Sequence, residues 1–334
     1  MIKCKIIYSI LTEKRNNMKL SLVVPCYNEE GNVELFYEEC VKAFAKTDID
    51  YEFVFVNDGS RDKTAEKLKK LYTEKTESRI TVVSFSRNFG KESAIYAGIK
   101  NSSGDYVSLI DADLQQRPEV VIEMMNILEN EPEYDCVAAY QGVRKEGSVM
   151  TGFKSGFYKL INKLSEVELH ADASDFRTFS RTVADAILEI GEYHRFSKGI
   201  FSWIGFNTKY IPYEVQERNS GETKWSFTKL VRYAFEGISA FSTKPLKLAT
   251  YLGMLTAFAA IVYLIVVIVQ RIWFNVAVSG YATIVALILL LGGIQLFCIG
   301  IIGSYLAKTY IQSKHRPIFV AKEILKPKEK FNKA

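Results

Sequence analysis

Two long uncharged stretches near the C-terminus constrain this chain more than any other feature. There is no charged side chain in the 23 residues between Lys247 and Arg271, and the next charge after Arg271 is Lys308. About 20 apolar residues are enough to cross the hydrocarbon core of a bilayer. The pattern predicts two transmembrane helices, at about 247–270 and 281–306. Two such stretches in series are rare in soluble cores, which argues against the alternative of two buried helices.

The charges beside these stretches indicate an orientation. The whole chain has a formal net charge of +5, and residues 308–334 contain eight Lys or Arg and two acids, a net of +6. Basic residues that flank membrane spans are typical of the cytoplasmic side. Lys244 and Lys247 precede the first span. We therefore expect a cytoplasmic-membrane protein with both ends of the hairpin in the cytoplasm, a basic tail at 308–334 and no nucleic-acid-binding surface.

The first 240 residues have a different pattern, in which short apolar runs alternate with stretches of helical periodicity. The runs predict strands at 20–24, 52–56, 80–85, 106–110 and 136–140, and the periodic stretches predict helices at 31–45, 64–71, 93–100 and 120–128. This alternation favours an α/β fold, with a mostly parallel sheet covered by helices on both faces.

The domain organisation follows from these two patterns. We expect a catalytic domain at 18–225 and the two-helix hairpin at 245–307. Residues 226–244 have an amphipathic pattern and lead into the first span, so they predict a helix that lies in the membrane interface. Residues 1–17 precede the first strand and are interpreted as an N-terminal extension or as a mis-assigned start.

Polar clusters follow three of the predicted strands. They are Pro25–Glu29, Asn57–Ser60 and Asp111–Gln115. In open α/β sheets, ligands bind at the carboxyl ends of the strands. We therefore expect the three clusters to meet at one edge of the sheet and to form a binding site there.

Asp111-Ala112-Asp113 is the sharpest of these features. Two carboxylates at this spacing, directly after a strand, can share a divalent cation that faces a diphosphate, and Mg²⁺ or Mn²⁺ prefers such oxygen ligands. A metal held there neutralises charge on a leaving nucleotide. The three histidines are isolated and no CxxC pair occurs, so a metal here would be held by oxygen. Solvated acids in a turn are the alternative, and the position after a strand favours the functional interpretation.

The other clusters supply candidate nucleotide contacts. Tyr27 could stack on a base, and Asn28 or Glu29 could reach the ribose or a base edge. Asp58 could accept a hydrogen bond from a base N–H, although Asp-Gly is also a common tight turn. Lys91, at the start of a predicted helix, could contact phosphate or only cap a turn.

Taken together, these motifs resemble the family 2 glycosyltransferases, and within them the polyprenyl-phosphate sugar transferases, the group of dolichyl-phosphate mannose synthase and bactoprenol glucosyltransferase. The resemblance covers nearly the whole chain after residue 18. Its strongest stretches are SLVVPCYNEE from Ser21, VNDGSRDKT from Val56, RNFGKE from Arg87 and DADLQ from Asp111. Further stretches are SDFR from Ser174, RF at Arg195, WIGF from Trp203, RNSGETKW from Arg218, GSY from Gly303 and RP at Arg316.

The resemblance implies a GT-A type fold and an inverting, metal-dependent transfer of a sugar, without a covalent intermediate, from a nucleotide-sugar to polyprenyl phosphate. A UDP-hexose, undecaprenyl phosphate, a role in cell-envelope glycan modification and a homo-tetramer are expected from relatives. By motif match the resemblance implies that Pro25, Tyr27, Glu29 and Asp58 hold the nucleotide and that Asp111 and Asp113 hold the diphosphate and the metal, with Gln115 assisting the metal. We add Asn28, Lys91 and Ala112 to the candidate donor residues. The chain departs from the family pattern at Asn57, where an acid is usual, and at Ser304, where Glu is usual.

The acceptor phosphate also needs residues that bind it. A phosphate monoester is largely dianionic at neutral pH and is already a nucleophile, so the enzyme must mainly bind and aim it. Three cations in the polar loops ahead of the interfacial helix could do so, namely Arg177, Arg218 and Lys224. We assign Arg177 and Lys224 to catalysis together with Asp111 and Asp113. Asp175 either orients Arg177 or assists the metal.

Three other functions compete with this one. A processive polysaccharide synthase of the same fold usually carries a Gln-x-x-Arg-Trp motif, which this chain lacks. A non-catalytic membrane scaffold would not need an intact Asp111, Asp113, Arg218 and Lys224. A soluble nucleotide-binding module would not need the two apolar spans.

Overall fold

The computed structural model describes residues 18–75, 79–142, 173–214, 242–274 and 280–327. The predicted extension at 1–17 and most of the predicted interfacial helix, 226–241, lie outside these ranges. The chain divides into two compact units. One contains all the described strands and the helices that cover them. The other contains the two long apolar helices.

The first unit is built on an eight-stranded sheet of order β7-β5-β6-β4-β1-β2-β3-β8. β1, β2, β3 and β4 are mutually parallel, and β5 and β7 are parallel to each other. β6 runs antiparallel to both β4 and β5, and β8 runs antiparallel to β3. The strands are β1 (Lys19–Cys26), β2 (Asp50–Asn57), β3 (Ile80–Phe85), β4 (Tyr106–Leu109), β5 (Cys136–Gln141), β6 (Ala173–Ser180), β7 (Thr208–Tyr213) and β8 (Ala321–Leu325).

Helices cover both faces of this sheet because its central strands are apolar on both sides. Leu22 and Phe55 point into one core, where they meet helix residues such as Phe36. On the opposite face, Gly98 lies so close to the Val23 side chain that a Cβ there would come within 2.2 Å of it. The helices are α2 (Val33–Phe44), α3 (Thr64–Glu74), α4 (Lys91–Asn101), α5 (Pro118–Asn130), α7 (Arg181–Glu189) and α8 (Ser197–Trp203).

The prediction of a mostly parallel α/β sheet is confirmed, and each strand and helix predicted between residues 20 and 140 is present. The sequence did not predict β6, β7 or β8, nor α7 and α8. β8 lies inside the segment 308–334 that we predicted as a basic tail, so part of that segment is an edge strand of the sheet.

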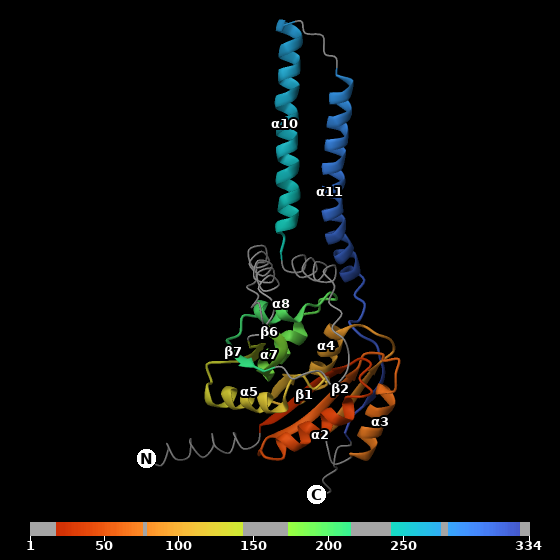
Figure 1. Cartoon of the computed structure of the whole chain (residues 1–334), viewed down its shortest axis with the longest axis vertical. Coiled ribbons are helices and arrows are strands. Elements are labelled where there is room, and N and C mark those ends of the chain that lie inside the picture. The colour runs from red at the N-terminus through yellow and green to blue at the C-terminus, as the bar shows by residue number, and fades with distance from the viewer. Residues whose placement is uncertain (1–17, 76–78, 143–172, 215–241, 275–279, 328–334) are drawn as a thin grey trace, which may run out of the picture. The chain divides into compact units, whose positions relative to one another are not determined.

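The second unit consists of two long helices that run side by side, α10 (Lys244–Phe274) and α11 (Tyr281–Ser313) (Figure 1). Both are long and apolar enough to cross a membrane, and the predicted spans lie inside them. The Tyr305 hydroxyl donates to the Ser242 carbonyl at 2.6 Å, which joins the end of α11 to the start of α10. Most of their large apolar side chains are exposed, as lipid-facing side chains would be.

Candidate active site

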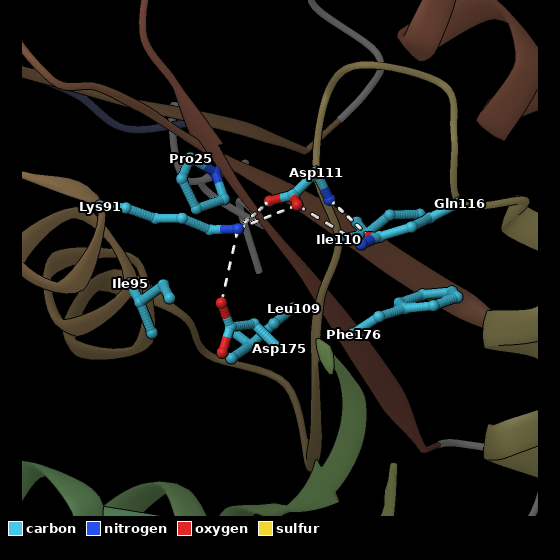
Figure 2. Close-up of a pocket in the computed structure, with 9 residues that line it drawn as sticks. All are labelled: Pro25, Lys91, Ile95, Leu109, Ile110, Asp111, Gln116, Asp175 and Phe176. Atoms are coloured by element: carbon cyan, nitrogen blue, oxygen red, sulfur yellow. Dashed lines mark hydrogen bonds and ion pairs between the residues drawn. The ribbon is translucent and has the colours of Figure 1, made fainter. Parts of the chain in front are cut away.

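A small pocket lies where β1 and β4 end and β6 begins (Figure 2). Asp111 follows β4 directly, Asp175 is near the start of β6, and Lys91 is the first residue of α4. The Lys91 ammonium lies 2.7 Å from Asp111 Oδ1 and 3.5 Å from Asp175 Oδ2. The lining residues are Pro25, Lys91, Ile95, Leu109, Ile110, Asp111, Gln116, Asp175 and Phe176.

The loop after β4 fixes the carboxylate pair. The Asp111 backbone N–H donates to Gln116 Oε1 at 2.8 Å, and the Gln115 N–H donates to Asp113 Oδ1 at 3.1 Å. Leu114 has a positive φ of 61°, which turns the chain sharply. Ala112 is buried between the two acids, whereas both acids are partly exposed. The loop therefore buries its apolar residue and keeps its carboxylates at the surface.

The charges in the pocket stabilise one another. Desolvation by the surrounding protein opposes the charge of the Lys91 ammonium, although the side chain as a whole is 46% exposed, and Asp111 and Asp175 raise the pKa of the ammonium above the usual value. Burial likewise opposes the charge of Asp175, and Lys91, Lys198 and Arg177 lower the pKa of its carboxyl. Lys91 and Asp175 are therefore both charged at neutral pH, and the carboxylate oxygens of the pocket are arranged to hold a cation.

The predicted first cluster lies close to the carboxylate pair. Tyr27 is 42% exposed and Asn28 is exposed, as groups that meet a ligand must be. Burial raises the pKa of Glu29, and the nearby charges of Asp113 and Asp111 raise it further. The structure thus brings the first and third predicted clusters together at one edge of the sheet.

Asp58 from the second cluster holds a loop. Its carboxylate accepts the backbone N–H of Phe89 at 2.6 Å and that of Gly90 at 3.0 Å. Burial raises the pKa of Asp58 despite these bonds. Gly59 has a φ of +62°, and a Cβ there would lie 2.3 Å from the Arg87 carbonyl carbon, so the turn requires glycine. Asp58 therefore fixes the donor loop, which we define as residues 86–91; its contact with a base stays a prediction.

The predicted acceptor cations divide into two groups. The prediction that Arg177 lies in a polar loop is wrong, because Arg177 is on β6 and only 4% exposed. Its Nη2 donates to the Ser174 carbonyl at 2.9 Å, and its guanidinium lies 4.0 Å from the centre of the Phe201 ring. Its Nε and the Oδ1 of Asp175 are buried and have no hydrogen-bond partner among the residues that the structure describes. Arg218 and Lys224 lie outside the described residues.

Two charged residues of the site were missed by the sequence reasoning. Glu92 accepts the backbone N–H of Ser197 at 2.9 Å, and burial together with Asp175 raises the pKa of its carboxyl. Burial lowers the pKa of Lys198, which lies near Asp175 and Arg177. The signal for Glu92 was its place beside Lys91 at a helix start. Lys198 carries no motif of its own.

The oxygen donors fit a hard divalent cation. Asp111 and Asp113 are two carboxylates on one loop, and the ammonium of Lys91 already shows that Asp111 attracts a positive charge. Among the residues that the structure describes, no group of three or more His, Cys, Asp or Glu side chains forms a complete metal site. Substrate phosphate oxygens commonly complete the coordination of Mg²⁺.

A mostly parallel sheet with a carboxylate pair and nucleotide-contact candidates at its carboxyl edge, followed by two membrane-length helices, defines a membrane-associated glycosyltransferase of the GT-A type. Residues 21–188 match the model of glycosyl transferase family 2. Residues 244–309 match the GtrB C-terminal hairpin. The chain belongs to glycosyl transferase family 2.

Relatives match over nearly their whole length. The chain is 41% identical over 304 residues to the putative glycosyltransferase CsbB of Bacillus subtilis, which covers 91% of each protein. It is 38% identical to the bactoprenol glucosyl transferase of Shigella phage SfV, covering 91% of this chain and 98% of that protein. Among solved structures, glucosyl-3-phosphoglycerate synthase from Mycobacterium tuberculosis is 20% identical with a TM-score of 0.47, covering 69% of this chain and 80% of that one.

Proposed function

We propose that this glycosyltransferase moves a hexose, with glucose as the first candidate, from its UDP-sugar to polyprenyl phosphate. The observation that carries the proposal is the match of both parts of the chain to one kind of protein. The bactoprenol glucosyl transferase of phage SfV aligns over 306 residues, which include the candidate site and the hairpin. A lipid-linked acceptor gives the two apolar helices a purpose.

The donor would bind at the carboxyl edge of the sheet. Tyr27 is exposed and free to stack on the base, and Asp58 lies at the base of the donor loop. Asp111, Asp113 and Gln115 would hold Mg²⁺ or Mn²⁺, which neutralises charge on the diphosphate when bound. Lys91 would stay beside Asp111 and add a positive charge next to the same phosphates.

The transfer needs no covalent enzyme intermediate. An oxygen of the acceptor phosphate attacks the anomeric carbon, the bond from that carbon to the UDP oxygen breaks, and UDP leaves with the bonding electron pair. The acceptor dianion has no proton to lose, so no general base is required. Arg177, Arg218 and Lys224 would bind and aim this dianion. Displacement from the opposite face inverts the anomeric configuration.

The hairpin would place the chemistry at the cytoplasmic side of the cytoplasmic membrane. Lys244 begins α10, and basic residues follow α11. β8 belongs to the catalytic sheet, and only residues 314–320 separate it from the end of α11. We also propose that the protein assembles as a homo-tetramer.

The decisive experiment is transfer of radiolabelled sugar from a panel of UDP- and GDP-sugars to undecaprenyl phosphate in detergent, with Mg²⁺ or Mn²⁺. Asp113→Asn is the test variant, and Asp185→Asn, at an exposed position of α7, is the matched control. We expect one UDP-hexose to give a labelled lipid product. This product should be absent when EDTA is added and in Asp113→Asn, and it should still form in Asp185→Asn. A growing polymer would instead support a processive synthase. Donor binding without any transfer to lipid would support a scaffold.

A further inference from the structure

The segment that follows the hairpin returns to the catalytic sheet and packs beside the donor loop. Pro317 to Leu325 belongs to the same compact unit as the sheet, and β8 pairs with the edge of β3. The pairing continues beyond the strands, because the Ser86 N–H donates to the Val320 carbonyl at 3.0 Å. Ser86 is the first residue of the donor loop. The segment that follows the hairpin is therefore hydrogen-bonded to the first residue of that loop.

Aromatic packing extends this contact toward the loop's interior. The Phe319 ring stacks on Phe85, with centroids 5.0 Å apart and planes 20° apart, and meets Tyr96 edge-on at 6.4 Å. Phe85 in turn meets Phe89 of the donor loop edge-on at 5.7 Å. Phe319 and Phe89 both pack on the small core cluster that includes Val83. Phe319 thus supports, through Phe85, the residue whose N–H is bonded to Asp58.

β8 is anchored at its far end as well. The Tyr72 hydroxyl donates to the Lys326 carbonyl at 2.7 Å, and Lys69 pairs with Glu323 at 3.1 Å. Leu325 packs against the larger core on the α3 side of the sheet. These contacts hold the strand in register without touching the donor loop. The segment therefore has two parts with separate contacts, one at the loop and one at the sheet edge.

We infer that Phe319 is a positioning residue for the nucleotide-sugar site, and that the segment after the hairpin holds the donor loop in its binding conformation. The inference rests on the proposed function for its substrate. The loop carries Lys91, which is bonded to Asp111, and its Phe89 and Gly90 N–H groups are bonded to Asp58. A shift of Phe89 would disturb these contacts together. The alternative is that β8 only covers an open sheet edge, which is a common need of edge strands.

The full-length protein in detergent provides the test, and hydrogen exchange of the donor loop is its first readout. Phe319→Ala is the test variant and Phe319→Leu keeps most of the apolar bulk. Two controls lie in the same segment: Val320→Ala, whose side chain is 46% exposed, and Leu325→Ala, which loosens the far end of β8. We expect Phe319→Ala to speed exchange of residues 86–91 roughly tenfold, Phe319→Leu to have a smaller effect, and both controls to match the wild type there.

The second readout is binding of UDP, measured by titration calorimetry. We expect Phe319→Ala to weaken binding roughly five- to tenfold while the KM for undecaprenyl phosphate stays unchanged. If exchange of the donor loop is unaltered in Phe319→Ala, or equally faster in Leu325→Ala, the positioning role is wrong and β8 only covers the edge. If the wild type binds no UDP but Phe319→Ala still loosens the loop, the positioning role stands and the proposed donor is wrong. Should Phe319→Ala fail to fold, Phe319→Leu decides by the same measurements.

Discussion

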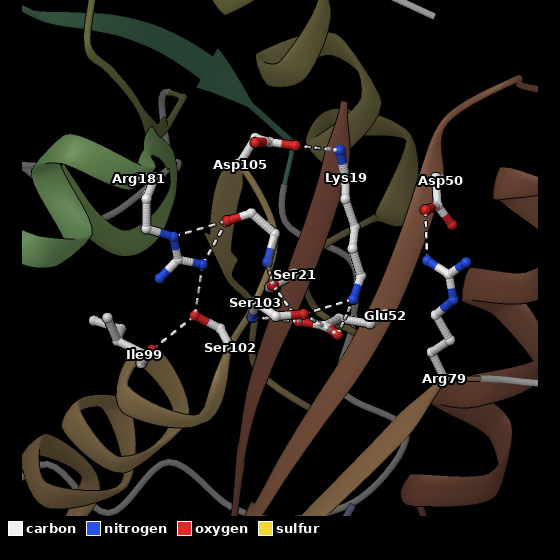
Figure 3. Close-up of polar contacts among 11 residues, drawn as sticks. Lys19, Ser21, Asp50, Glu52, Arg79, Ile99, Ser102, Ser103, Asp105 and Arg181 are labelled. Carbon is white, nitrogen blue, oxygen red and sulfur yellow. Dashed lines mark hydrogen bonds and ion pairs between the residues drawn. The ribbon is translucent and has the colours of Figure 1, made fainter. Parts of the chain in front are cut away.

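The two edges of the parallel strands contain similar polar residues that are used in different ways. At the amino edge, Glu52 is 5% exposed, and its carboxylate accepts Ser21 Oγ at 2.6 Å, the Ser103 N–H at 2.6 Å and the ammonium of Lys19 (Figure 3). At the carboxyl edge, Asp111 shares Lys91 with Asp175 (Figure 2). The Oδ1 of Asp175 is buried and has no partner within the described part of the chain.

From this difference we propose that the amino edge serves stability and the carboxyl edge serves binding. Glu52 bonds to two residues of β1 and to the turn before β4, so its network is complete within the chain. Lys91 is 46% exposed along its side chain, whereas Lys19 is 18% exposed. Among the described residues, a buried polar atom without a hydrogen-bond partner occurs at each edge, Asp175 Oδ1 at the carboxyl edge and Ser180 Oγ at the amino edge. The exposure of Lys91 beside two carboxylates therefore supports the proposal that the carboxyl edge binds a ligand.

The largest effect should come from the carboxylate pair. We expect Asp111→Asn and Asp113→Asn each to lower the transfer rate about a thousandfold, because the charge that holds the metal and diphosphate is lost. Stability of Asp113→Asn should stay level or rise, since removing this charge relieves repulsion with Glu29. Asp111→Asn also loses the ion pair with Lys91, so its stability should fall slightly. Initial rates and thermal unfolding of the same samples check this. Unfolding that parallels the loss of rate would contradict the division between the two edges.

Glu52 should behave in the opposite way. Glu52→Gln leaves the buried partners of the carboxylate poorly satisfied, so we expect a loss of about 3 kcal/mol in the free energy of unfolding. The turnover number of the folded fraction should not change. Asp50→Asn is the control on the same strand, because its pair with Arg79 is about half exposed and should contribute below about 1 kcal/mol. Denaturant unfolding and active-site titration separate the two quantities.

Lys91 should have an intermediate effect on activity. Lys91→Met removes the cation between Asp111 and Asp175, so we expect a rate about tenfold to a hundredfold lower, mainly through a higher KM for the donor. Lys91 also lowers the pKa of Asp175, so the acid limb of the pH–rate profile should move to higher pH in this variant. Lys91→Arg keeps the charge, so its transfer rate should lie between that of the wild type and that of Lys91→Met. An unchanged donor KM in Lys91→Met would remove Lys91 from the binding site.

The sequence predicted the central strands because they are continuous apolar runs between turns. It did not predict β6, because Asp175 and Arg177 interrupt the apolar pattern there. The guanidinium of buried Arg177 packs on Phe201 from α8, and this contact joins residues that are far apart in the chain. β8 was missed for a related reason: Lys322 and Glu323 are exposed on an edge strand, and the segment resembles a charged tail.

In the site, too, contacts between residues that are far apart in the chain could not be predicted from the sequence. Asp111 and Asp113 were predictable because the two acids are neighbours in the sequence and follow a strand. The contact of Lys91 with Asp175 depends on antiparallel β6 lying beside β4, with Leu109 opposite Arg177. No local pattern contains that pairing. Asp58 was predicted as a nucleotide contact, and its bonds to the donor loop depend on the turn at Gly59 that brings residues 86–91 alongside.

The pH dependence should give the smallest effect and should separate the edges again. Burial alone would raise the pKa of Glu52, but Lys19, Ser21 and Ser103 bond to its carboxylate and lower the pKa below the ordinary value. Its stabilisation is therefore complete above the unfolded pKa of about 4.3 and is lost as pH falls through the lower folded value. The difference in unfolding free energy between wild type and Glu52→Gln should thus be constant above about pH 5 and shrink only below about pH 4.

At the carboxyl edge the sign is reversed, because burial raises the pKa values of Glu29 and Asp58. These acids take up protons at a higher pH than ordinary carboxyls, and their protonation favours the folded state while it removes charge from the binding edge. Donor binding should therefore weaken on acidification before stability falls. UDP affinity and thermal unfolding, measured on one pH series, test this order. A simultaneous loss of both would mean that one network serves the two edges, and the contrast between binding and stability would be wrong.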